Sequence, residues 1–439
     1  MPAAAAEGAI ASPLDRPFYF IVVLWGEAFR TCFMEFCLAS ALSPGNIPAL
    51  DPARRSKFLI ATRPDDWAAI GETDMFRLLE RYVKPVYIEI PPCPPGVHGC
   101  QHMGTGHRQA CDMAHRDKAY AVVLTPDSML SDGSVARLQD LARQGAELVL
   151  APALRFGEEP FFAHLRAMNA VPAERRGGSA SPLAITGRQM VFAAVNGFHS
   201  ETLAYEWDAP GLMAITPAAW WRVPGEDGIV LHSLSWAPLL LDYASVGAHD
   251  TSTFDQWTLD GDYLFNNSGG IKRMHVVQDS DEMFLASWGP LAERPIRKTR
   301  FPFDKLLAGH FFRQSFYSKF FDPLKRKLFF LPVRWHAKPL NATWAVVEDG
   351  AARELDHWLR PLGGPTLSPA EQASDQVFAT PNPFIWTLKS LAYGWMYRGR
   401  IAYHLGRMIR GDRATGARIM GFVRTFVVGA GSSSGDVGG

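Results

Sequence analysis

The chain has 439 residues, of which 47% are hydrophobic and 20% charged. This composition excludes a disordered chain, and the length argues against a single small binding module, because domains average roughly 150 residues. Lysine plus arginine and aspartate plus glutamate number 44 each, so no global charge attracts the protein to nucleic acid. No apolar run reaches the roughly 18 residues that span a bilayer.

The N-terminal residues 1–16 lack a basic region and a continuous apolar stretch, and we interpret them as a flexible leader rather than a secretory signal. Five cysteines in a chain without such a signal favour reduced thiols over a disulfide framework. Both features predict a cytoplasmic protein.

Strands and helices alternate over the next part of the chain. The first run, FYFIVVLWG (18–26), is apolar and rich in β-branched and aromatic residues, which is typical of a buried parallel strand. Further strands are predicted at 57–62, 84–92, 119–125 and 146–154, with helices at 27–42, 64–82, 106–118 and 133–145. This alternation predicts an α/β fold with a Rossmann-like, mainly parallel sheet, whose ligands bind at the carboxyl ends of its strands.

The segment from 102 to 134 carries the most informative functional pattern. His107 and Arg108 belong to a predicted helix, and the strand after it delivers Asp127 and Ser128 at its carboxyl end. We predict that these four residues contact a nucleotide, since an aspartate there can hold a cation or a ribose hydroxyl and Arg108 can meet phosphate. The alternative interpretation of Asp127 is a strand-end turn residue.

This order of elements resembles the nucleotide-sugar domain of GT-A fold glycosyltransferases, over about a third of the chain and more weakly to about residue 290. The resemblance implies that Trp25, Gly26 and Glu27 border the nucleotide pocket. It also implies that Asp127 holds a divalent cation, manganese or magnesium, or the diphosphate of the donor. Those enzymes usually place an Asp-any-Asp motif at this strand end, whereas this chain has a single aspartate.

Two later stretches add candidate side chains. GT-A enzymes often supply a late histidine to the same metal or diphosphate, and the resemblance gives this role to His232; a hydrogen-bonded core histidine is the alternative. The stretch 249–267 places acids beside aromatic rings, as a sugar acceptor site requires. There Asp260 or Asp262 is the candidate catalytic base, with a turn-forming or calcium-binding role as the alternative.

A second acidic cluster, Asp279, Ser280 and Asp281, follows another apolar run. It matches Asp-any-Asp better than the Asp127 segment does, but it lies much farther from the first strand than is usual in GT-A enzymes. We expect either an alternative metal or acceptor site, or a solvated junction between a strand and a loop.

Cysteines and histidines are dense between residues 93 and 115: Cys93, His98, Cys100, His102, His107, Cys111 and His115. Thiolates and imidazoles at this density suit zinc, although no paired ligand spacing is complete. The alternatives are a loop that contacts the nucleotide or the acceptor, and incidental residues.

The C-terminal part of the chain is basic and aromatic. Residues 381–424 hold eight basic residues and one acidic residue, a local excess of seven positive charges. Their amphipathic pattern predicts a helix that lies on an anionic membrane surface or packs on the catalytic domain. No nucleic-acid-binding motif accompanies the patch, so no nucleic-acid partner is expected.

These patterns predict five segments: a leader (1–16), a nucleotide-sugar-binding α/β half (17–155), an acceptor-side completion of the catalytic unit (156–295), a basic aromatic region (296–424) and a flexible tail (425–439). The predicted function is a hexosyltransferase-like glycosyltransferase that moves a sugar from a nucleotide-diphosphate sugar to a glycan or lipid-linked acceptor. We place it in bacterial-type envelope polysaccharide or glycolipid synthesis, in the cytoplasm or peripherally on the inner face of the membrane.

The alternative from another functional class is a non-catalytic α/β protein with a zinc loop that assembles complexes at a membrane surface. Dinucleotide oxidoreductases and P-loop NTPases are disfavoured, because their glycine-rich phosphate-binding motifs are absent from the sequence.

Overall fold

Strand β1 (Phe18–Val23) lies inside a seven-stranded sheet, and all six of its residues are buried. The computed structural model describes residues 16–172, 181–213, 216–255, 257–259, 261–291, 304–317 and 327–359. All of these belong to one compact unit of the chain, Met1–Pro365. A β-branched and aromatic strand that is buried throughout is typical of the centre of an α/β sheet.

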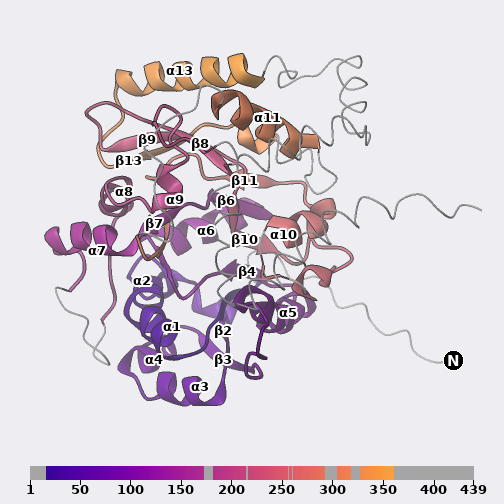
Figure 1. Cartoon of the computed structure of the whole chain (residues 1–439). Helices are drawn as coiled ribbons and strands as arrows, with labels where there is room; N and C mark the ends of the chain where they lie inside the picture. Colours follow the sequence, from indigo (N-terminus) through magenta and orange to yellow (C-terminus); the bar gives the residue numbers. More distant parts are fainter. Residues whose placement is uncertain are drawn as a thin grey trace, which may run out of the picture. The chain divides into compact units, whose positions relative to one another are not determined.

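The sheet has the order β11-β6-β10-β4-β1-β2-β3 (Figure 1). Its other strands are β2 (Lys57–Thr62), β3 (Lys84–Glu89), β4 (Tyr120–Val123), β6 (Leu148–Pro152), β10 (Trp236–Asp242) and β11 (Met274–Val276). Strand β10 is antiparallel to both of its neighbours, and every other pairing in the sheet is parallel. The predicted mixed α/β architecture with a mainly parallel sheet is therefore confirmed, with β10 as the exception.

Helix α5 (Gly99–Arg116) packs closely on one face of this sheet. A Cβ atom added to Gly106 would lie 2.8 Å from Ala61 Cβ and 2.9 Å from Val23 Cγ1. Val23 and Ala61 are paired across β1 and β2, so the helix crosses directly over the two strands. Only glycine permits this approach.

Helix α5 begins seven residues before the start that the sequence predicts. The His98 side chain accepts a hydrogen bond from the Cys100 N–H and so caps the first turn. Three glycines in the first half of α5 lower its helix propensity, and tertiary packing overrides that weak local preference.

The remaining helices of the first half are α1 (Glu27–Cys32), a π-helix (Phe33–Cys37), α2 (Leu38–Ala41), α3 (Pro64–Gly71), α4 (Asp74–Leu79) and α6 (Ser134–Arg143). Each of the two helices predicted before residue 83 is thus divided. The π-helix interrupts the first, and Thr73, whose hydroxyl accepts from the Phe76 N–H, begins a new helix within the second.

Two three-stranded sheets lie beside the large one. The first joins β5 (Ser128–Leu130), β12 (Leu285–Gly289) and β7 (Arg155–Gly157), and the second joins β13 (Val333–His336), β9 (Gly228–Ser233) and β8 (Ala218–Arg222). The later helices are α7 (Glu158–Ala167), α8 (Gly187–Val195), α9 (Ser200–Leu203), α10 (Gly261–Asn267), α11 (Asp304–Tyr317) and α13 (Ala342–Leu359). A second hydrophobic core forms where α11 and α13 cover β8 and β9 (Figure 1).

Within the described ranges, no helix combines the length and the apolar character that crossing a bilayer requires. Residues 381–424, predicted to contact a membrane surface, lie outside those ranges. The predicted segment boundaries remain predictions.

The contact at Gly106 gives a direct test of how α5 packs. We expect Gly106→Val to lower the free energy of unfolding by about 1–3 kcal/mol through overpacking, even though valine is the better helix former. Gly71→Val is the matched control, because a Cβ atom at Gly71 in α3 meets nothing within 4 Å. Urea denaturation of both variants measures the difference, and equal unfolding midpoints would contradict the proposed packing.

Candidate functional site

The carboxyl end of β1 forms a tight turn at the edge of the sheet. Gly26 has a φ of 83°, a left-handed conformation that favours glycine, and its N–H donates to Asp66 Oδ2 at 2.8 Å. Trp25 is partly buried and Glu27 is exposed. Strand β1 pairs with β2 on one side and β4 on the other, so this turn lies where the strand order reverses, the place at which α/β sheets bind ligands.

A buried carboxylate organises this turn. Asp66 is 1% exposed and pairs with Arg30 at 2.6 Å and with Arg63 at 3.3 Å. Burial raises the pKa of Asp66, but the Gly26 N–H and the two guanidinium groups outweigh burial and hold the pKa below its ordinary value. Asp66 therefore fixes both the turn and two cationic side chains beside it.

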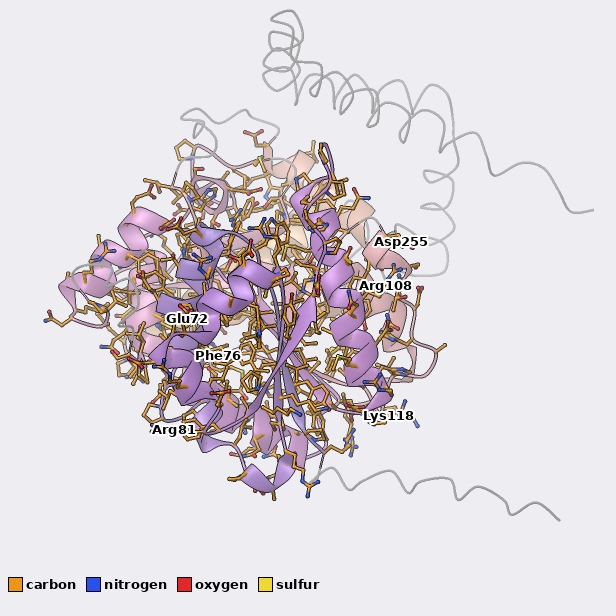
Figure 2. All side chains as sticks on the ribbon, turned by 90° about the horizontal axis from the view of Figure 1, so that it is seen from below. Glu72, Phe76, Arg81, Arg108, Lys118 and Asp255 are labelled. Carbon is orange, nitrogen blue, oxygen red and sulfur yellow. The ribbon has the colours of Figure 1, made fainter. Side chains whose placement is uncertain are left out.

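His107 and Arg108 are held by the chain that follows β10. His107 is buried, and its Nδ1 lies 2.9 Å from Thr258 Oγ1. Arg108 forms an ion pair with Asp255 at 2.6 Å, and Figure 2 shows the two together beside α5. These partners anchor the later segment to α5.

Asp127 and Ser128 follow β4 at the carboxyl edge, as predicted. The Ser128 hydroxyl donates to the Thr125 carbonyl at 2.7 Å and closes the turn. The Asp127 carboxylate is 28% exposed and lies 3.8 Å from an Arg155 nitrogen. Asp127 is thus accessible, with a cation at its side.

His232 lies on β9, in a different sheet from the strand that precedes Asp127. Its Nδ1 is 3.0 Å from the Phe329 carbonyl oxygen, and burial lowers its pKa to about 4. Among the described residues, no hydrogen bond, ion pair or ligand group joins His232 to Asp127. The candidate bases are only partly described: Asp260 lies outside the described residues, and Asp262 is in the first turn of α10 with its side chain outside them.

The second acidic cluster lies beside a histidine, His336, that comes from a distant part of the sequence. Asp279 and Asp281 follow β11, and His336 ends β13; ligand atoms of all three lie within 4.8 Å of one another. Strand β11 is parallel to β6, so this Asp-Asp-His cluster lies at the same carboxyl edge as the turn after β1. The pairing of β13 with β9 brings His336 there, and nothing local in the sequence indicates it.

Hydrogen bonds orient the His336 ring. Its Nδ1 lies 2.7 Å from the Lys338 carbonyl oxygen, which can only accept, so Nδ1 carries a proton. The other nitrogen, Nε2, lies 2.8 Å from Asp279 Oδ1 and 3.9 Å from Asp281 Oδ2. Such an arrangement is typical of metal-binding histidines, which donate one N–H to a carbonyl and direct the other nitrogen to the ion.

The cluster is electrically balanced without a metal. The hydrogen bond from His336 lowers the pKa of Asp279, and the bidentate contact with Arg188, at 2.9 and 2.6 Å, lowers the pKa of Asp281. Burial lowers the pKa of His336, but its bond to Asp279 and the two negative charges outweigh burial and raise it. Two carboxylates therefore face two cationic groups.

The donor set fits a divalent cation. Two carboxylates and one imidazole are ligands that manganese and zinc both accept. A bound ion would replace the proton that His336 Nε2 shares with Asp279, and it would compete with Arg188 for Asp281. Among the described residues this is the one group of three such ligands, and the Cys/His-rich segment forms none.

No family model matches the sequence, and no curated protein matches it. Among solved structures, S. aureus TarS is similar over 71% of this chain and 42% of its own, with 9% identity and a TM-score of 0.28. The chain thus spans less than half the length of TarS. A TM-score this low carries no inference about fold or activity.

The buried His107 predicts a loss of stability in acid. Burial lowers its pKa from 6.5 to about 4, so between those pH values the unfolded chain takes up a proton that the folded protein excludes. The free energy of unfolding then falls as the pH drops from 6.5 to 4, by about 3 kcal/mol for this residue. Burial lowers the pKa of His232 in the same direction.

The variant His107→Asn keeps a hydrogen-bond acceptor near Thr258 but does not titrate. Between pH 6.5 and 4, we expect its free energy of unfolding to fall by about 3 kcal/mol less than that of the wild type. Urea denaturation at a series of pH values measures the difference. The same acid-induced loss in both proteins would show that His107 is protonated in the folded state.

Proposed function

We propose that the protein is a glycosyltransferase that uses a nucleotide-diphosphate sugar as donor and a divalent cation held by Asp279, Asp281 and His336. The observation that carries the proposal is this Asp-Asp-His cluster, with its oriented imidazole, on the carboxyl edge of a mainly parallel sheet. When bound, such a cation would neutralise charge on the departing diphosphate. The proposal also includes a glycan or lipid-linked acceptor and a role in the synthesis of envelope polysaccharide or glycolipid.

The β5–β12 pairing supports assigning Asp127 to the same site region. Ser128 pairs with Ser287 and Leu130 pairs with Leu285, so the ladder runs from Asp127 toward Asp281. Strands β4 and β11 are three strand positions apart in the sheet, or about 14 Å, so the two acidic groups serve one elongated site rather than one ion.

Individual roles follow from these positions. The turn at Trp25–Glu27, held by Asp66, borders the nucleotide, and Arg30 and Arg63 place positive charge beside it. Asp127 with Arg155 binds polar groups of the donor farther along the edge. Asp260 or Asp262 remains the proposed base for a glycan or lipid-linked acceptor, and residues 381–424 the proposed membrane contact.

Thermal unfolding with Mn²⁺ and a panel of nucleoside diphosphates tests the cation site. At a hundred times the dissociation constant, bound ligand should add about 2.7 kcal/mol to the stability of the wild type. Asp281→Asn should abolish this gain.

Asp140→Asn is the matched control, because Asp140 is a similarly exposed aspartate that also pairs with an arginine. It should behave as the wild type does. If Asp127→Asn abolishes the gain while Asp281→Asn leaves it intact, the cation binds after β4 and the assignment to the Asp-Asp-His cluster is wrong. Hydrolysis of a nucleotide-sugar panel tests the activity itself.

A further inference from the structure

A hollow of about 680 Å³ lies between the end of β8 and the later turns of α13, within the size range of small-molecule sites. Its walls come from Glu206 and Asp208, from Trp221, Arg222 and Pro224, and from residues 347–357 of α13. We call it the α13 hollow. It contains neither the Asp-Asp-His cluster nor the turn after β1, so the proposed transfer site does not account for it.

The floor of the α13 hollow is apolar and open. Trp221, which is 7% exposed, and Val347 provide apolar surface. Because Gly350 has no side chain and Ala351 has only a methyl group, they leave space above this part of α13. A Cβ atom at Gly350 would meet nothing within 4 Å. A flat apolar face of a ligand can therefore lie along α13 at this point.

Charged groups surround this floor in balanced number. Arg222 pairs with Glu206 at 3.0 Å, and Lys305 pairs with both Asp208 and Glu354 at 2.9 Å. Arg353 also lines the hollow and has no ion-pair partner among the described residues. The three carboxylates that line the hollow are therefore matched by two lining guanidinium groups and by Lys305, which pairs with two of them from outside the lining. A strongly charged ligand would meet groups of its own sign, whereas a neutral ligand rich in hydroxyl groups would not.

The Glu354 carboxylate at the hollow is held in place and can still accept further hydrogen bonds. Glu354 Oε2 accepts hydrogen bonds from Trp207 Nε1 at 3.0 Å and from Trp358 Nε1 at 3.1 Å, which holds the carboxylate in place. Its other oxygen makes no hydrogen bond within the described ranges. A ligand hydroxyl group that enters the hollow can donate a hydrogen bond to this free oxygen of Glu354.

We propose that the α13 hollow binds a neutral saccharide. A pyranose has an apolar face for the floor, and its hydroxyl groups both donate and accept, which matches carboxylates interspersed with guanidinium groups. The argument for saccharide binding uses only the residues at the hollow and does not depend on the proposed function. The further step, that this saccharide is part of the acceptor, rests on the proposed function.

Helix α13 connects the hollow to the transfer edge. Near its start, the Trp344 ring packs on His336 with centroids 5.7 Å apart, and Glu348 pairs with Arg334. Glu354 lies six residues beyond Glu348, or about 9 Å along the helix axis. A saccharide held in the α13 hollow would lie along the helix that also contacts the Asp-Asp-His cluster.

The test is saturation-transfer NMR on the full chain with three sets of oligosaccharides: neutral hexose and N-acetylhexosamine chains, hexuronate chains and glucosamine chains. We expect signals from neutral chains only. Gly350→Leu, which adds a side chain to the hollow at a position where a Cβ atom meets nothing within 4 Å, should weaken this binding at least tenfold, and Arg353→Ala should weaken it less. Gly71→Leu is the matched control, since Gly71 is also a helical glycine with open space around it, and it should bind as the wild type does.

Absence of any saccharide signal, or neutral binding that Gly350→Leu leaves unchanged, would overturn the proposal. Preferred binding of the hexuronate or glucosamine chains would overturn the assignment of a neutral ligand. Asp281→Asn separates the two proposals: if it removes the Mn²⁺-dependent response and leaves saccharide binding intact, both stand. If wild-type protein binds neutral saccharides but neither binds nor hydrolyses nucleotide sugars, the hollow remains a saccharide site and the glycosyltransferase proposal fails.

Discussion

The pairing of β1 with β2 on one side and β4 on the other determines where the proposed transfer site can lie. Parallel strands bring their carboxyl ends to one edge, and the point where strand order reverses, here at β1, is where sheets of this kind bind their ligands. The close approach of α5 at Gly106 keeps both strands covered. Consequently the turn at Gly26, the Asp127 segment and the Asp-Asp-His cluster all follow strands that end at this edge.

The carboxylates at this edge are held in small ion-paired groups. Asp66 holds Arg30 and Arg63, while Asp281 is paired with Arg188. Burying a carboxylate is unfavourable unless such partners are present. A ligand or cation that binds here therefore exchanges one set of charged partners for another.

The sequence allowed the strands and helices of residues 18–154 to be predicted well, because hydrophobic periodicity and caps are local signals. The antiparallel insertion of β10 could not be predicted, since a buried apolar run does not encode its direction. Asp279 and Asp281 were recognised from their spacing. His336 was missed because only the pairing of β13 with β9 brings it near them.

A high local density of cysteine and histidine residues was a poorer predictor of a binding site. Within the Cys/His-rich segment, His98 caps α5, His102 bonds to the Pro91 carbonyl and Cys111 is fully buried. The sequence pattern gave Asp66 no role, yet it is the buried anchor of the turn after β1. Such roles depend on what packs against a side chain, which a sequence pattern does not contain.

The most direct test of the account is an anomalous X-ray difference map from crystals soaked in Mn²⁺ and a nucleoside diphosphate. The account predicts a manganese peak about 2.0–2.3 Å from carboxylate oxygens of Asp279 and Asp281 and from His336 Nε2. It also predicts nucleotide density that reaches the turn at Gly26. A manganese peak beside Asp127 with none at His336, or nucleotide bound away from the carboxyl edge of the sheet, would contradict it.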